Sequence, residues 1–232
     1  VTPNMTRISE LLKRLVEGGI EVTNEIKKVM INTEIESFSD YDCDPFYSDR
    51  PIPFTETEIG EVKTISAPHM IVTLLHNMEL LEGQEVIIIG SKGGYLAALV
   101  AQLIGENGIV RVLDTCSNVI SHSKQRLTHW PTIEFRELES IEVSPVAFPG
   151  EFDRVLVTGH IEELPSWITD RISDTGFVIA PIGPNNNQHL MKIEKQDDEL
   201  FPTDLGPVCF GSLESRRHGN QYVSPVELAE LL

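Results

Sequence analysis

The feature that most constrains the fold is a run of β-branched residues that ends in a glycine-rich turn. Residues 85–90 read EVIIIG, and SKGG (91–94) follows at once. A continuous apolar run of this length is typical of a strand that is buried on both faces of a parallel sheet. Residues 95–104 then have the apolar content of a helix, and glycines in the turn allow the backbone to approach a ligand closely. The sequence therefore predicts a strand, a sharp turn and a helix at the centre of the fold.

Strands and helices alternate through most of the remaining chain. Helices are expected at 68–80, 118–127 and 164–172, and strands at 109–113, 133–136, 154–157, 177–180 and 190–193. Such alternation predicts right-handed βαβ units. We therefore expect an α/β fold that is doubly wound and Rossmann-like, with a mostly parallel sheet and helices on both faces. The tail SPVELAELL, which starts at Ser224, predicts a capped terminal helix.

Two amphipathic helices are expected before this alternation, because apolar residues recur at helical spacing over 8–16 and again over 22–30. Residues 32–63 show little periodicity and predict a long loop, of the kind that acts as a lid or contacts a substrate. The whole 232-residue chain is expected to form one domain. In it, residues 1–66 form a helical and loop cap and residues 67–232 form the core.

Composition narrows the class of protein. With 18 basic and 36 acidic residues, the chain carries a net charge of −18. This charge argues against a nucleic-acid partner or an anionic membrane surface, since both attract Lys and Arg. No run approaches the ~20 apolar residues of a membrane span, and no signal peptide is visible, so we expect a cytoplasmic protein. Cys43, Cys116 and Cys209 form no CxxC pair and predict reduced thiols. The acidic segment 40–49 lacks the EF-hand spacing, so no metal site is predicted.

An acidic residue indicates what the glycine turn binds. Asp114 ends the strand at 109–113, about 20 residues beyond Gly94, where a carboxylate can accept hydrogen bonds from ribose hydroxyls. The turn fits the dinucleotide pattern GxGxxG poorly, because Lys92 stands where that pattern has a glycine. S-adenosylmethionine has no phosphate and carries a cationic sulfonium, which an acidic protein does not repel. The residues therefore favour S-adenosylmethionine as the cofactor.

An ordered set of motifs resembles the protein-L-isoaspartate O-methyltransferase family over residues 47 to 195. The motifs are YSDRPIPF (Tyr47–Phe54), TISAPHM (Thr64–Met70), IGSKGGYLAALVAQL (Ile89–Leu103), FDRVLVTGHIEELP (Phe152–Pro165) and IAPIGPNNNQHL (Ile179–Leu190). The resemblance implies a class I methyltransferase fold. It also implies methyl transfer from S-adenosylmethionine to the side carboxylate of isoaspartyl residues in damaged proteins. The partners would then be isoaspartyl-containing peptides or proteins.

The same resemblance implies roles for individual residues. Ser66 would be the catalytic hydroxyl beside the substrate carboxylate. The residues implied to bind the cofactor are Thr64, His69, Gly90, Gly94, Tyr95 and Asp114, and those implied to contact substrate are Ile65, Thr158 and Gln188. Structural roles remain open for four of them. His69 has the spacing of a partly buried imidazole with satisfied hydrogen bonds, which only orients the loop. Ser66 has the position of a helix N-cap, Thr158 that of a strand-end hydroxyl, and Gln188 that of a loop amide.

Three positions depart from the family pattern. Ile88 replaces an acidic residue of the first core strand, Lys92 replaces the middle glycine of the turn, and RELES (136–140) stands where the family has a GDG turn. These changes motivate a second hypothesis, in which the chain keeps the fold but serves as a catalytically impaired interaction or assembly subunit. A third is methylation of another substrate, such as a peptide aspartate or a tRNA base.

Overall fold

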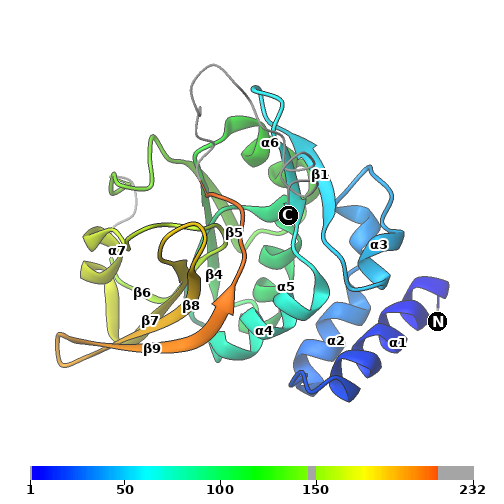
Figure 1. Ribbon diagram of the computed structural model, residues 1–232, viewed down its shortest axis with the longest axis horizontal. Coiled ribbons are helices and arrows are strands. Elements are labelled where there is room, and N and C mark those ends of the chain that lie inside the picture. The colour runs from blue at the N-terminus through cyan, green and yellow to red at the C-terminus, as the bar shows by residue number, and fades with distance from the viewer. Residues whose placement is uncertain (1, 146–149, 214–232) are drawn as a thin grey trace.

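The computed structural model describes residues 2–145 and 150–213. The terminal helix expected from Ser224 lies outside the described residues. Seven strands form the central sheet (Figure 1), in the order β5-β4-β3-β6-β7-β8-β9. Their bounds are β3 (Glu85–Ile89), β4 (Ile109–Asp114), β5 (Ile133–Glu137), β6 (Phe152–Val157), β7 (Ile172–Ile182), β8 (Gln188–Gln196) and β9 (Glu199–Val208).

The sheet is mostly parallel, as the sequence predicts. Strands β3 to β7 pair in parallel, whereas β8 pairs with β7, and β9 with β8, in antiparallel fashion. Strand β3 lies between β4 and β6, so the chain winds outward from β3 first in one direction and then in the other. Ligands of doubly wound sheets bind at such a switch point, outside the carboxyl ends of the strands.

Helices cover the two faces of the sheet unequally. Val86 and Ile88 of β3 belong to a core cluster that includes α4 (Pro68–Met78), α5 (Tyr95–Ile104) and α6 (Ser117–Arg126). Ile87 and Ile89 point to the opposite face, where α7 (Ser166–Asp170) packs. Figure 1 shows α7 on one side of the sheet and α4 and α5 on the other. This burial of both faces of β3 explains the unbroken apolar run in the sequence.

Of the two N-terminal helices, the second packs beside α5 and α4 and the first packs on the second. They are α1 (Pro3–Glu17) and α2 (Asn24–Asn32), and each begins at a threonine whose hydroxyl caps it: Thr2 accepts from Met5 N–H and Thr23 from Ile26 N–H. Their buried apolar residues join the same cluster as those of α5. The helical spacing in the sequence thus predicts both helices correctly.

The long loop expected over 32–63 is wrong. This segment contains a 3-10 turn at Ile35–Ser37, α3 (Asp44–Tyr47) and a hairpin of β1 (Ile52–Glu56) and β2 (Val62–Ile65). The elements have three to five residues each, which is too short for a periodic pattern to emerge. The acidic residues of this segment contact separate partners, since Asp44 pairs with Arg7 and Asp49 with His69.

The last strands also differ from expectation. Strands β7 and β8 are longer than the predicted 177–180 and 190–193, α7 is shorter than the predicted 164–172, and β9 was not predicted at all. Strand β9 contains Pro202, Gly206 and Pro207, which weaken a strand pattern and are tolerated because β9 is an edge strand. No helix in the described part of the chain is long and apolar enough to cross a membrane.

Candidate functional site

The carboxyl ends of three adjacent strands meet at the glycine turn. Gly90 follows β3, Asp114 ends β4 and Thr158 follows β6. Backbone bonds join all three strands here, since Gly90 N–H donates to Leu113 O at 2.7 Å and Thr158 N–H donates to Ile89 O at 2.9 Å. The structure therefore brings together three of the predicted site residues at the switch point of the sheet.

Asp114 is bound directly to the turn. One carboxylate oxygen accepts Ser91 N–H at 2.8 Å and the other accepts Cys116 N–H at 3.0 Å. Burial raises the pKa of Asp114, and these two N–H donors act in the opposite direction. A carboxylate has about four acceptor positions, so each oxygen keeps one for a ribose hydroxyl. The carboxylate thus has acceptor positions that hydroxyl groups of a ligand could use.

The glycines of the turn are required by its shape and packing. Gly90, Gly93 and Gly94 have φ values of 96°, 72° and 86°, in the left-handed region that favours glycine. A Cβ atom on Gly90 would lie 2.2 Å from Thr158 Oγ1, and one on Gly94 would lie 2.8 Å from Leu127 Cδ1. The backbone therefore has a single close-packed conformation at the end of β3.

Ser66 lies close to this turn. It follows β2, whose last residue, Ile65, packs on the turn so closely that a Cβ on Gly93 would lie 3.1 Å from Ile65 Cγ1. The alternative role of Ser66 as a helix cap is wrong, because the N-cap of α4 is Ala67 and no side chain caps that helix. Thr64 is half-buried on the same strand, opposite Pro53. The hairpin thus brings the start of the TISAPHM motif to the glycine turn.

His69, in the first turn of α4, contacts the segment that leads into the β1–β2 hairpin. Its backbone N–H and its ring Nδ1 both bind the carboxylate of Asp49, at 2.8 and 3.0 Å. Asp49 lies three residues before the start of the hairpin, and Ser66 immediately follows its end. The pair therefore holds the two ends of the hairpin against α4, so that His69 orients the segment that carries Ser66.

Three predicted site residues make contacts within the protein. The Tyr95 ring is fully buried, with edge contacts to Phe38 at 5.3 Å and Phe46 at 5.6 Å between ring centroids.

The Thr158 hydroxyl lies 2.7 Å from Gly90 O, to which it donates. Gln188 is paired with the backbone of Phe210, accepting its N–H at 2.7 Å and donating to its carbonyl at 3.0 Å. The side-chain contacts with cofactor or substrate implied for these residues remain predictions.

Residues 209–213, which we call the strap, cross the ends of β3 and β6. His160 pairs with the strap through its backbone, and a Cβ on Gly159 would lie 2.6 Å from Leu213 Cα. Sequence reasoning missed the strap, because no local pattern in GPVCFGSL indicates that it contacts a turn more than a hundred residues earlier. The strap therefore supplies one wall of the site.

Lys92 occupies the turn in an unfavourable conformation. Its φ of 47° is left-handed, and its ammonium nitrogen lies 6.0 Å from the centroid of the Phe210 ring. Burial, together with the nearby Lys63, lowers the pKa of Lys92 to about 8, although Asp114 acts in the opposite direction. A cation is thus present between the strap and the turn.

Comparison with known proteins assigns the chain to a family. The family model described as protein-L-isoaspartate(D-aspartate) O-methyltransferase matches residues 6–218. The protein-L-isoaspartate O-methyltransferase of Methanosarcina mazei is 28% identical over 207 residues, which cover 87% of this chain and 82% of the relative. That of Methanocella arvoryzae is 30% identical over 166 residues, covering 71% and 84%.

Solved structures share the fold. The crystal structure of a Plasmodium falciparum protein assigned to the same enzyme, in complex with S-adenosyl-L-homocysteine, is 23% identical. It superposes with a TM-score of 0.76 and covers 92% of this chain and 99% of its own. A second protein-L-isoaspartate O-methyltransferase structure, 22% identical, gives a TM-score of 0.78 over 90% of this chain and 66% of its own. The predicted Rossmann-like class I methyltransferase fold is therefore confirmed.

Proposed function

Because the chain belongs to the protein-L-isoaspartate(D-aspartate) O-methyltransferase family, we propose that it methylates the side-chain carboxylate of isoaspartyl residues in proteins, using S-adenosylmethionine. The observation that supports this proposal is the close packing of Ile65 on the glycine turn, where a Cβ on Gly93 would lie 3.1 Å from Ile65 Cγ1, because Ser66 is the next residue of the chain. On this proposal, a hydroxyl for the substrate and a turn for the cofactor come from separate parts of the sequence and are brought near each other by the fold.

The reaction requires little of the protein beyond alignment. A carboxylate is ionised at pH 7 and is already a nucleophile, so no general base is needed. S-adenosylmethionine supplies an activated methyl group when it is bound. The turn at Gly90–Gly94 and the Asp114 carboxylate would hold its adenosyl part, and the Ser66 hydroxyl would donate a hydrogen bond that fixes the substrate carboxylate.

The direct test is methyl transfer to a peptide. Purified protein is incubated with methyl-labelled S-adenosylmethionine and a peptide containing one isoaspartyl residue. A matched peptide with ordinary aspartate is the control. We expect a base-labile methyl ester on the isoaspartyl peptide alone. Absence of ester at millimolar donor would overturn the proposal.

One observation favours a second candidate, a family member that binds proteins without catalysis. Lys92 places a cation in the turn, which opposes a sulfonium. Calorimetric titration distinguishes the two functions, because a protein without catalysis is expected not to bind S-adenosylmethionine at millimolar concentration. Micromolar binding would remove the support for this candidate.

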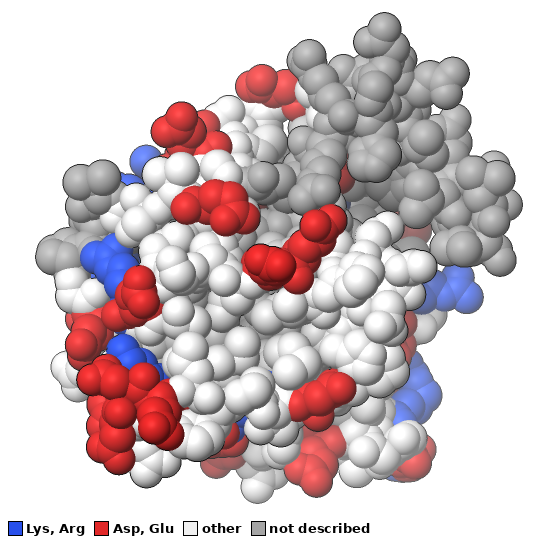
Figure 2. Space-filling model, turned by 60° about the vertical axis from the view of Figure 1, so that its left-hand side comes forward, with Lys and Arg blue, Asp and Glu red and all other residues white. Residues whose placement is uncertain are grey.

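We further propose that the substrate is protein and not nucleic acid, and that the enzyme works in the cytoplasm. The net charge of −18 opposes a phosphate backbone. On the face drawn in Figure 2, acidic side chains are dispersed and Lys and Arg lie mainly near the margins. Cys43, Cys116 and Cys209 are free thiols, which suits a reducing compartment.

A further inference from the structure

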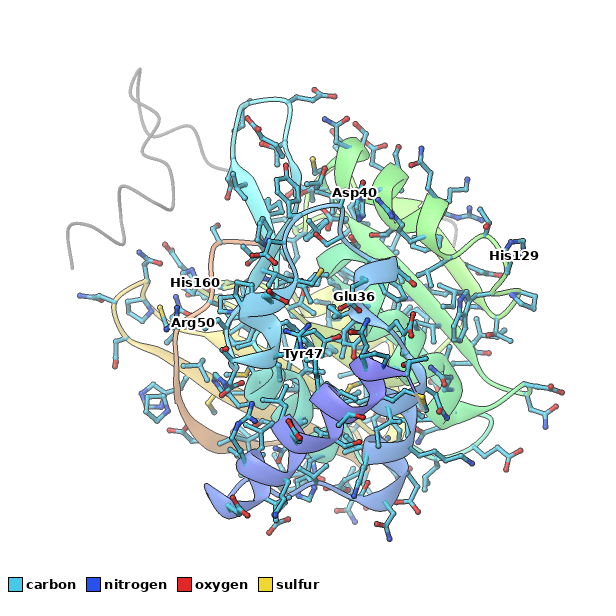
Figure 3. The ribbon with its side chains drawn as sticks, turned by 90° about the vertical axis from the view of Figure 1, so that its right-hand side faces the viewer. Glu36, Asp40, Tyr47, Arg50, His129 and His160 are labelled. Carbon is cyan, nitrogen blue, oxygen red and sulfur yellow. The ribbon has the colours of Figure 1, made fainter. Side chains whose placement is uncertain are left out.

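A groove of about 1030 Å³ lies between α1 and the segment 47–49 that leads into the hairpin. Arg7 and Arg14 line it from the helix, and His69 lines it from the start of α4. Figure 3 looks onto this side and shows Tyr47 next to α1. The site described above uses His69 and Asp49 to hold the hairpin but assigns no function to the groove itself.

The lining of the groove includes a residue that is close to Ser66 in the sequence. His69 belongs to its lining and is three residues from Ser66, so the two Cα atoms are at most about 10 Å apart. The pairing of Ile52 with Ile65 brings the residues before β1 alongside those after β2, so Asp49 lies at the same end. An extended polypeptide with one residue at Ser66 could therefore continue into the groove after about three residues.

The charges in the groove indicate what kind of chain it binds. Arg14 donates one hydrogen bond, to Tyr47 O at 2.7 Å, and has no carboxylate partner among the described residues. A guanidinium has five donors, so most of those of Arg14 remain available. Arg7 is paired with Asp44, and Glu10 is a carboxylate of the lining that opposes an acidic ligand. In a chain with a net charge of −18, an arginine without a carboxylate partner favours an anionic group.

We propose that this groove binds the polypeptide segment that flanks the isoaspartyl residue, and that Arg14 pairs with an acidic side chain of that segment. The proposal rests on the proposed function and adds to it a preference for sequence. Leu11 and Leu15, which are buried at the base of α1, line the groove between its charged residues. Arg14 is thus a specificity residue that lies outside the reacting centre.

Binding of labelled peptides tests the proposal without any methyl transfer. Fluorescence anisotropy is measured on isoaspartyl peptides rich in alanine, with one Glu placed about three to seven residues to either side of the isoaspartyl residue. Each has a counterpart with Gln at the same position. At one or more positions we expect the Glu peptide to bind about 5- to 20-fold more tightly than the Gln peptide, as a charged hydrogen bond would give. Equal binding of every Glu and Gln pair overturns the proposal.

Three variants locate the effect. Arg14→Gln is expected to abolish the preference for Glu, and Arg14→Lys to retain part of it because the charge remains. Lys13→Gln is the matched control, because Lys13 is exposed on the same helix and does not line the groove. A preference that survives in folded Arg14→Gln overturns the proposal, and thermal melting of each variant establishes that it is folded.

Peptide binding and methyl transfer together distinguish an error about the groove from an error about the proposed activity. A charge preference that depends on Arg14, without any methyl ester, supports the groove and refutes the activity. Methyl ester formation with no charge preference does the reverse. Where esters form, Arg14→Gln is expected to raise KM for the Glu peptide and to leave kcat unchanged, because Arg14 does not contact the reacting atoms.

Discussion

The Asp114 carboxylate accepts the backbone N–H of Ser91 at 2.8 Å, and thereby joins the end of β4 to the turn that follows β3. The bond serves the fold and the site together. It satisfies a buried N–H donor in a left-handed turn, and it fixes the carboxylate at the place where a ribose is expected. Changes at Asp114 should therefore affect stability and cofactor affinity at once.

Replacing Asp114 with Asn should weaken binding of S-adenosylhomocysteine about 10- to 100-fold, because charged hydrogen bonds are lost. Calorimetry measures the affinity, and thermal unfolding measures the accompanying loss of stability. Asp153→Asn is the matched control, since Asp153 accepts Glu85 N–H at 2.8 Å at the opposite end of β3. That variant should lose stability and keep its affinity. An equal loss of affinity in both variants would contradict a direct role of Asp114.

Replacing Ser66 with Ala should lower kcat about 10- to 100-fold and leave the free energy of unfolding within about 0.5 kcal/mol. The reason is that Ser66 does not cap α4. Thr23→Ala provides the contrast, because Thr23 caps α2 and its loss should cost about 1 kcal/mol without affecting kcat. Denaturant unfolding and initial rates check both. A Ser66→Ala variant that is unstable and still active would refute this division of roles.

Replacing Lys92 with Gly should stabilise the protein by about 1 kcal/mol, because the left-handed φ of 47° is unfavourable for a residue with a side chain. It should also improve binding of S-adenosylmethionine relative to S-adenosylhomocysteine about 3- to 10-fold. The two ligands differ by the charge on sulfur, which the ammonium repels. Calorimetric titrations of both ligands give the ratio. An unchanged ratio would mean that the ammonium lies away from the bound sulfur.

The same repulsion should depend on pH. The pKa of Lys92 is lowered to about 8 because burial disfavours its charged form. Between pH 8 and about 10.5 the folded protein therefore binds fewer protons at Lys92 than the unfolded chain does. The cost of burying the charged ammonium lowers the free energy of unfolding fully below pH 8, and this cost is relieved as pH rises to about 10.5. In the wild type, the affinity for S-adenosylmethionine relative to that for S-adenosylhomocysteine should therefore increase when the pH is raised from about 7 to about 9. Lys92→Gly should show no such change in the ratio of the two affinities.

Replacing Tyr95 with Phe should leave cofactor affinity unchanged and stabilise the protein by about 1 kcal/mol. Within the described residues the buried Tyr95 hydroxyl has no hydrogen-bond partner, so its removal relieves a desolvation cost. The ring contacts with Phe38 and Phe46 remain. Thermal unfolding and ligand titration are the measurements. Weaker cofactor binding would show instead that the Tyr95 side chain acts at the turn, as the family resemblance implies.

The sequence predicts the elements around the turn well, because their determinants are local. The run at 85–90 must be buried on both faces, and Asp114 must lie at the same edge as Gly90 because parallel strands end together. The side-chain direction of Tyr95 could not be predicted. It depends on Phe38 and Phe46, which come from a segment without periodic pattern.

The contacts of Thr158 and Gln188 could not be predicted from the sequence for a related reason. The Thr158 hydroxyl donates to the carbonyl of Gly90, 68 residues earlier in the chain. The Gln188 amide donates to the carbonyl of Phe210, 22 residues later. Such distant pairs form only once the sheet has assembled. Local patterns therefore identify the residues that form the turn, whereas its surroundings follow from tertiary packing.

The strap has a consequence for how the molecule is made. Its residues leave the ribosome long after β3 and its turn, yet Gln188 and His160 bind it across the end of that strand. A nascent chain that has emerged only as far as β7 can begin to form the parallel sheet. The edge of the sheet at the glycine turn nevertheless stays without one wall until residues 209–213 have also been translated.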